Sequence, residues 1–75
     1  MFETLKKYLI EELHVNAAEI TMDSKLADDL GINSIDQADL ALFCEEQFNV
    51  TVDDEDLHKF VTLGDIVRHV EAAQQ

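Results

Sequence analysis

The stretch Asp28-Asp29-Leu30-Gly31-Ile32-Asn33-Ser34-Ile35-Asp36 divides the chain into two parts with different patterns. Upstream of it, residues 15–33 show no sustained helical period, and this segment is predicted to be a long connector. Downstream, the residues 34–37 read Ser-Ile-Asp-Gln, a capping-box pattern in which a hydroxyl residue starts a helix. Gly31 can adopt backbone angles that residues with a Cβ reach only at a cost. The stretch therefore predicts a glycine turn followed by a helix that is capped by Ser34.

The apolar spacing of the rest of the chain predicts an all-α fold. Apolar residues recur at helical spacing over residues 2–14, 34–48 and 63–70, and an acidic run at 53–56 opens a short helix. Thr62 is expected to cap the last helix, with Asp65 three residues later. The chain has no Pro or Trp and only two Gly, which leaves few signals for strands. The expected architecture is a small four-helix bundle with three longer helices and one short helix. A long connector joins the first two helices and contains a short helical turn at 17–19.

Length, charge and cysteine content limit the possible functions. We expect 75 residues to form a single domain, 1–75, with no room for a substrate pocket beside a large core. A net charge of −12 disfavours nucleic acid and anionic membranes as partners and favours basic protein surfaces. One cysteine fits a reducing compartment, and no stretch has the length of a transmembrane helix or the pattern of a signal peptide. These features predict a cytoplasmic, monomeric protein that does not insert into membranes.

The helix predicted over residues 34–48 has two apolar lines. One line is a core stripe made of Leu40, Phe43, Cys44 and Phe48. One small bundle cannot easily bury a second line as well, so that line is predicted to be an exposed interaction patch. Its apolar members are Ile35, Ala38 and Leu42, and its acidic rim is made of Asp36, Asp39, Glu45 and Glu46. There is no Lys or Arg between Lys25 and Lys59, so the charge around this patch would steer basic partners.

Ser34 can be interpreted in three ways. As a structural residue it is a helix cap. As a modification site it follows a glycine turn, its neighbours Ile32 and Ile35 are expected to be exposed, and a phosphodiester on its hydroxyl would face free helix amides. As a hydrolase nucleophile it lacks the G-x-S-x-G elbow, and no histidine of the chain has an obvious orienting partner. These features favour modification over catalysis.

No metal site is predicted. The acidic run at 53–56 lacks the alternating ligands and central glycine of an EF-hand loop. His14, His58, His69 and Cys44 do not have the spacing of zinc ligands, and Cys44 is expected to be a small buried apolar residue. A small calcium-responsive acidic protein remains an alternative interpretation of the charge.

Over essentially its whole length the chain resembles acyl carrier proteins of the freestanding bacterial type. The matching stretches are residues 29–36, 40–48, 52–56 and 62–67. The attachment motif of that family is Gly, any residue, Asp, Ser, Leu. In this chain Asn33 replaces the Asp and Ile35 replaces the Leu, and Leu26 stands where the family often has Phe. The loss of charge at Asn33 is expected to affect the choice of partner more than attachment.

The resemblance implies a carrier rather than an enzyme. Ser34 would receive 4′-phosphopantetheine from coenzyme A through a holo-synthase, a phosphopantetheinyl transferase, and the thiol of this arm would hold acyl groups as thioesters. Basic surfaces of synthases, transferases and reductases of fatty acid, polyketide or related lipid biosynthesis would dock on the helix face. The docking residues would be Ile35, Asp36, Asp39, Leu42, Glu45 and Glu46, and an acyl pocket would be lined by Leu40, Phe43, Cys44, Phe60 and Val67. The alternative is an unmodified acidic module for protein interaction or regulation.

Overall fold

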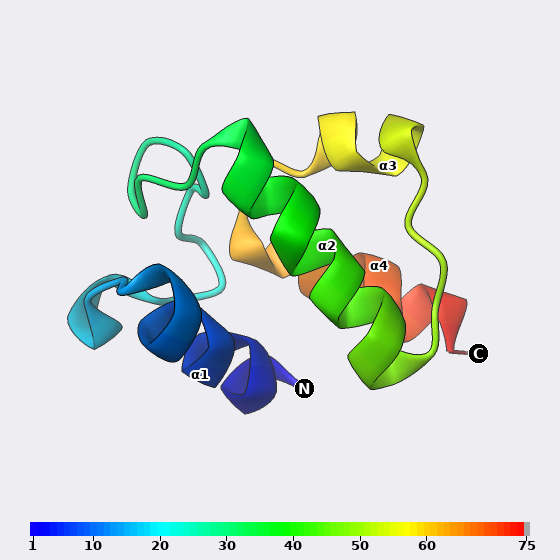
Figure 1. Ribbon diagram of the computed structural model, residues 1–75, viewed down its shortest axis with the longest axis horizontal. Coiled ribbons are helices and arrows are strands. Elements are labelled where there is room, and N and C mark those ends of the chain that lie inside the picture. Colours follow the sequence, from blue (N-terminus) through cyan, green and yellow to red (C-terminus); the bar gives the residue numbers. More distant parts are fainter. Residues whose placement is uncertain (75) are drawn as a thin grey trace.

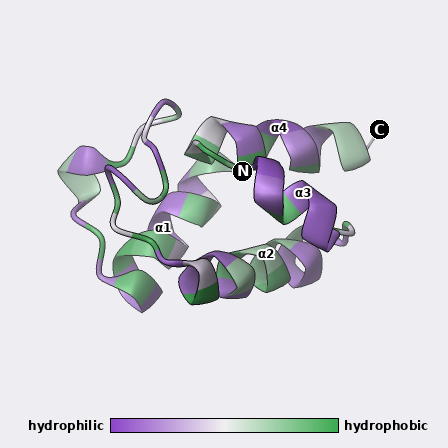
Figure 2. Ribbon diagram, turned by 90° about the horizontal axis from the view of Figure 1, so that it is seen from above, coloured by the Kyte–Doolittle hydropathy of each residue, from purple (hydrophilic) through white to green (hydrophobic). Residues whose placement is uncertain are grey.

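The computed structural model describes residues 1–74 and is helical (Figure 1). Helix α1 spans Phe2–Leu13, a 3-10 turn spans Ala17–Glu19, α2 spans Ser34–Phe48, α3 spans Asp54–Lys59 and α4 spans Leu63–Ala73. In Figure 2, α2 and α4 lie on opposite sides of the molecule, and α1 and α3 lie between them in this view. The predicted all-α fold, with three longer helices, one short helix and a long connector, is confirmed. In the described part of the chain, no helix is both long and apolar enough to cross a membrane.

The hydrophobic core is built from one side of each longer helix and from the connector. Leu5 and Leu9 of α1 are completely buried, as are Leu40 and Cys44 of α2. The predicted stripe of α4 is also buried, and it consists of Leu63, Ile66, Val67 and Val70. The connector contributes Val15, Ile20, Leu26, Leu30 and Ile32. Burial of these connector residues explains how a segment without a helical period keeps a defined path before α2.

The expectation that Ile32 is exposed is wrong. Its side chain is only 3% exposed and belongs to the core, and its amide donates to the carbonyl of Leu26 at 2.9 Å. Gly31 has φ +66°, in the left-handed region that glycine adopts most easily, and the turn there brings the next residue inward. Ile35, three residues later, is 73% exposed as predicted.

The connector is hydrogen-bonded to the segment that starts α4. The amide of Leu26 donates to the Val61 carbonyl at 2.8 Å, and the amide of Gly64 donates to the Met22 carbonyl at 2.8 Å. A Cβ added to Gly64 would lie 2.8 Å from that same carbonyl oxygen, which is closer than van der Waals contact allows. The approach of connector and helix therefore requires glycine at this position.

The start of α4 has the capping box that the sequence predicts. The Thr62 hydroxyl accepts from the Asp65 amide at 3.2 Å, and the Asp65 carboxylate accepts from the Thr62 amide at 3.0 Å and the Val61 amide at 2.9 Å. Arg68 donates to the same carboxylate at 2.8 Å. These backbone hydrogen bonds, aided by Arg68, lower the pKa of Asp65 to about 2. The ionised carboxylate of Asp65 therefore stabilises the folded state.

Replacing Asp65 with Asn should destabilise the protein in a pH-dependent way. Because the folded-state pKa of Asp65 lies below its ordinary value of 3.8, its contribution is present above about pH 4 and is lost as pH falls toward 2. We expect Asp65→Asn to lower the free energy of unfolding by about 1–2 kcal/mol at pH 7, and by little near pH 2. Urea unfolding at several pH values measures this difference. Glu71→Gln removes an equal charge from an exposed position of α4 and is the control; an equal loss in both variants would contradict the prediction.

Candidate functional site

Ser34 is an exposed residue at the first position of α2, and it is not the helix cap. The cap is Asn33, whose side-chain oxygen accepts from the Asp36 amide at 2.8 Å. The predicted capping box of Ser34 and Gln37 is therefore wrong. Asn and Ser are about equally good caps, and Asn33 has the extended backbone, with ψ 177°, from which a side chain reaches the amide three residues on. Because Asn33 caps the helix, the Ser34 hydroxyl is not needed for the fold.

The first turn of α2 favours an anion beside Ser34. Asn33 satisfies two amides of this turn, since its side chain accepts from Asp36 and its carbonyl accepts from Gln37 at 2.9 Å. The amides of Ser34 and Ile35 have no hydrogen-bond partner among residues 1–74. Unpaired amides at a helix start, together with the helix dipole, stabilise negative charge. A phosphodiester on the Ser34 hydroxyl fits this environment.

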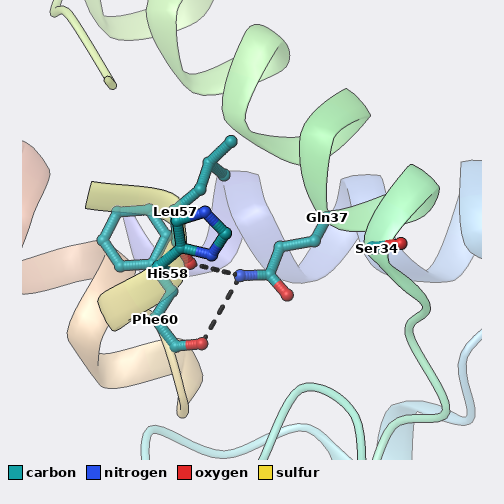
Figure 3. A pocket seen from close by; sticks show the side chains of 5 residues that line it. All are labelled: Ser34, Gln37, Leu57, His58 and Phe60. Carbon is teal, nitrogen blue, oxygen red and sulfur yellow. Dashed lines mark hydrogen bonds between the residues drawn. The ribbon is translucent and has the colours of Figure 1, made fainter. Parts of the chain in front are cut away.

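A pocket of about 280 Å³ lies beside Ser34 and is bounded by α2 and the end of α3. Its lining consists of Ser34, Gln37, Leu57, His58 and Phe60 (Figure 3). Figure 3 shows the Gln37 side chain reaching from α2 toward α3, where its amide nitrogen donates to the Leu57 carbonyl at 2.9 Å and to the Phe60 carbonyl at 3.4 Å. Gln37 thus connects the two helices across the pocket. Sequence analysis missed this role, because its partners lie 20 and 23 residues away.

The five residues of the expected acyl pocket are not gathered around one cavity. Leu40, Cys44 and Val67 are buried in the core, and burial raises the pKa of the Cys44 thiol to about 12. Phe60 is half-buried and lines the pocket beside Ser34. Phe43 is half-buried as well, but its ring stacks on Tyr8 of α1, with centroids 4.3 Å apart.

Four of the six expected docking residues form an exposed line along α2. Ile35 and Leu42 are 73% and 53% exposed, and Asp39 and Glu46 are exposed beside them. Their spacing of three and four residues places all four on one side of the helix. Asp36 is half-buried at the edge of this line. Glu45 is half-buried too, and its carboxylate accepts from the Val52 amide at 3.2 Å. Glu45 therefore has a structural partner in the loop after α2.

The histidines do not form a catalytic arrangement with Ser34. In the described residues none of them hydrogen-bonds to the Ser34 hydroxyl, and the ring nitrogen of His69 lies 3.0 Å from the Thr51 carbonyl oxygen instead. His69 also meets Phe60 edge-on, with ring centroids 5.5 Å apart, and thereby joins α4 to the end of α3. Over residues 1–74, no group of three or more His, Cys, Asp or Glu side chains is arranged to hold a metal ion.

Comparison with known proteins identifies a family. A family model described as a phosphopantetheine attachment site matches residues 3–70. The chain is 39% identical over 71 residues to an acyl carrier protein of Wolinella succinogenes, covering 95% of this chain and 93% of the relative. It is 44% identical over 71 residues to an acyl carrier protein of Thermotoga maritima, covering 95% and 88%. The fold is similar to a crystal structure of an acyl carrier protein from Thermotoga maritima, with a TM-score of 0.83, 22% identity and coverage of 95% and 82%.

Proposed function

The chain belongs to the phosphopantetheine-binding family of acyl carriers, and we propose that Ser34 is the residue to which its prosthetic group is attached. The observation that carries this proposal is the position of the Ser34 hydroxyl. It is exposed at the first residue of α2, while Asn33 alone caps the helix. A transferase can therefore modify the hydroxyl without disturbing the hydrogen bonds of the helix start.

The residues of the chain supply an acceptor and an environment rather than catalysis. The Ser34 oxygen would attack the phosphorus of coenzyme A that bears the pantetheine, forming a phosphodiester as the bond to the nucleotide breaks. Its proton would leave to a base of the transferase. The unpaired amides of Ser34 and Ile35 would lie next to the new negative charge. Once attached, the thiol of the arm supplies the thioester chemistry.

We propose that the carried groups are intermediates of fatty acid or related acyl biosynthesis. The relatives named above are acyl carrier proteins, which supports acyl groups as the cargo. The biosynthetic enzymes would dock on the acidic and apolar line of α2, with Ile35, Leu42, Asp39 and Glu46 at its centre. Asp36 and Glu45 would lie at its edges, and one oxygen of the Glu45 carboxylate already accepts from the Val52 amide.

We further propose that an acyl chain enters the bundle between α2 and α3, past Gln37. The pocket beside Ser34 supports this route, because Phe60 both lines the pocket and packs against the core. Leu40, Cys44 and Val67 of that core would line the inner part of the route. Phe43 packs against the same core from the side of Tyr8.

Replacing Gln37 with Ala should loosen the end of α3. The change removes the side-chain amide that donates to the Leu57 and Phe60 carbonyls. A net contribution of about 1 kcal/mol per hydrogen bond, about 2 kcal/mol for the two, predicts roughly thirtyfold faster amide exchange over residues 54–60. Hydrogen exchange followed by NMR measures this change. Gln47→Ala, at an exposed position of the same helix, is the control. Unchanged exchange over 54–60 in Gln37→Ala would contradict the role of Gln37 in holding the end of α3 against α2.

The proposed function is tested by incubating the full chain with coenzyme A, Mg²⁺ and a phosphopantetheinyl transferase of broad specificity. Intact mass spectrometry should show one added phosphopantetheine per chain, and peptide mapping should place it on Ser34. A chain that stays unmodified at saturating transferase would overturn the proposal and favour an unmodified interaction module.

A further inference from the structure

The pocket beside Ser34 is lined by both apolar and polar side chains. Leu57 and Phe60 are the apolar ones, and Gln37 and His58 bring an amide and an imidazole. The volume of the pocket is about 280 Å³. A cavity of about 150 Å³ is enough for one benzene molecule, so this pocket has room for a thioester and the first carbons of an acyl group. Its polar side chains determine which atoms on those carbons are bound favourably.

The hydrogen bonds of Gln37 fix the orientation of its side-chain amide. Its nitrogen donates to the Leu57 carbonyl at 2.9 Å and to the Phe60 carbonyl at 3.4 Å. Because a carbonyl oxygen only accepts, the nitrogen must be the atom that faces α3, and the amide cannot turn over without losing both hydrogen bonds. Figure 3 shows the side-chain oxygen of Gln37 turned away from these two carbonyls. Gln37 therefore holds a hydrogen-bond acceptor at a fixed place in the lining of the pocket.

The acceptor on Gln37 is available to a ligand. Among residues 1–74 the side chain of Gln37 forms hydrogen bonds only through its nitrogen, so its oxygen, Oε1, has no donor. In the same part of the chain no side-chain nitrogen or oxygen is both fully buried and unpartnered, so Oε1 remains accessible. His58 is exposed and can rotate, whereas the Gln37 amide is already held in place. A preorganised acceptor binds a donor without a further loss of side-chain entropy.

We propose that Gln37 is a specificity-determining residue, through which this chain shelters 3-hydroxyacyl groups in preference to saturated acyl groups of the same length. The inference rests on the proposed function, in which a group carried through Ser34 enters past Gln37. The thioester end of such a group stays nearest the arm, so the carbons next to the thioester lie in the pocket. A hydroxyl on carbon 3 can donate to Gln37 Oε1, whereas a methylene there leaves this oxygen unpaired. A 3-oxo group only accepts, so it gains nothing from Oε1.

The test compares butyryl, 3-hydroxybutyryl and 3-oxobutyryl groups on the full chain, each loaded by the transferase from its coenzyme A thioester. Hydroxylamine cleaves accessible thioesters, and each rate is divided by that of the same free coenzyme A thioester to cancel intrinsic reactivity. We expect the normalised rate for 3-hydroxybutyryl to be about two- to tenfold lower than for the other two, which is the effect of one hydrogen bond. The side-chain amide resonances of Gln37 should also shift with this group alone. Equal rates for all three groups, or equal protection of 3-oxobutyryl, would overturn the inference.

Variants of Gln37 separate the acceptor from the packing. Gln37→Leu keeps a side chain of similar size but removes Oε1, and we expect the three normalised rates to become equal. The same change removes the hydrogen bonds to α3, but that loss affects all three groups alike, so the ratio of rates is the readout. Gln47→Leu, at an exposed position of α2 outside the pocket, is the matched control and should keep the wild-type ratio.

The outcomes distinguish this inference from the proposed function. A ratio that persists in Gln37→Leu, or one that is lost in His58→Leu instead, would overturn the assignment to Gln37. Equal rates on a wild-type chain that is fully loaded would refute the inference and leave attachment at Ser34 intact. A wild-type chain that gains no group from any of the three thioesters would refute attachment, and the inference with it.

Discussion

Ser34→Ala should give a folded protein that gains no phosphopantetheine. The substitution removes only the hydroxyl oxygen, and α2 keeps its cap because the Asn33 side chain still accepts from the Asp36 amide. We therefore expect the melting temperature of the variant to stay close to that of wild type. Loading by a phosphopantetheinyl transferase, followed by intact mass spectrometry, should fall from complete modification to none.

The other serine of the chain is the matched control. Ser24 is 6% exposed, accepts from the Thr21 amide at 2.9 Å and donates to the Glu19 carbonyl. Ser24→Ala should therefore be loaded fully but be less stable by about 1–2 kcal/mol, because the part-buried Thr21 amide and Glu19 carbonyl lose their partner. Loading of Ser34→Ala would place attachment at another residue. Loss of the fold in Ser34→Ala would mean that the Ser34 hydroxyl has a structural role that the Asn33 cap does not replace.

Charge reversal at the two exposed acids of the docking line should slow loading strongly. In Asp39→Lys combined with Glu46→Lys, the carboxylates that would attract a basic partner become repulsive at the centre of the face. We expect kcat/KM for the transferase to fall by about 10- to 100-fold at low salt, because like charges at an interface reduce both encounter rate and affinity. Added salt should narrow the difference from wild type by screening the charges.

The choice of residues in this experiment follows from their contacts. Glu45 is left unchanged because its carboxylate accepts from the Val52 amide, so its reversal would disturb the loop after α2. A second double variant, Glu3→Lys with Glu71→Lys, alters net charge equally at exposed positions of α1 and α4. If both double variants slow loading by the same factor, total charge rather than the face of α2 governs docking.

The helices could be predicted from the sequence because their signals are local. Apolar spacing, the acidic first turn at 53–56 and the Thr62–Asp65 capping box all act within one or two turns of helix. The residue that caps α2 could not be predicted from local signals. Asn33 and Ser34 are adjacent and both are good caps, and the decision depends on the path of the chain through Gly31 and the buried Ile32.

The departure from the family motif at Asn33 also has a structural explanation. Asp and Asn both cap helices through a side-chain oxygen, so Asn33 keeps the hydrogen bond to the Asp36 amide while it removes one negative charge beside Ser34. The replacement therefore leaves the presentation of Ser34 intact. A partner that contacts a negative charge at this position would bind a chain with Asn33 differently from one with Asp.

By itself, the sequence determined the all-α class, the long connector, the candidate Ser34 and the acidic line of α2. These features depend on residue type and on spacing within a few residues. Only the tertiary structure decided that Ile32 is buried, that Gln37 hydrogen-bonds to α3 and that Phe43 stacks on Tyr8. The partners of Gln37 and Phe43 lie 20 or more residues away, and such contacts form only when whole helices pack, so no local pattern encodes them.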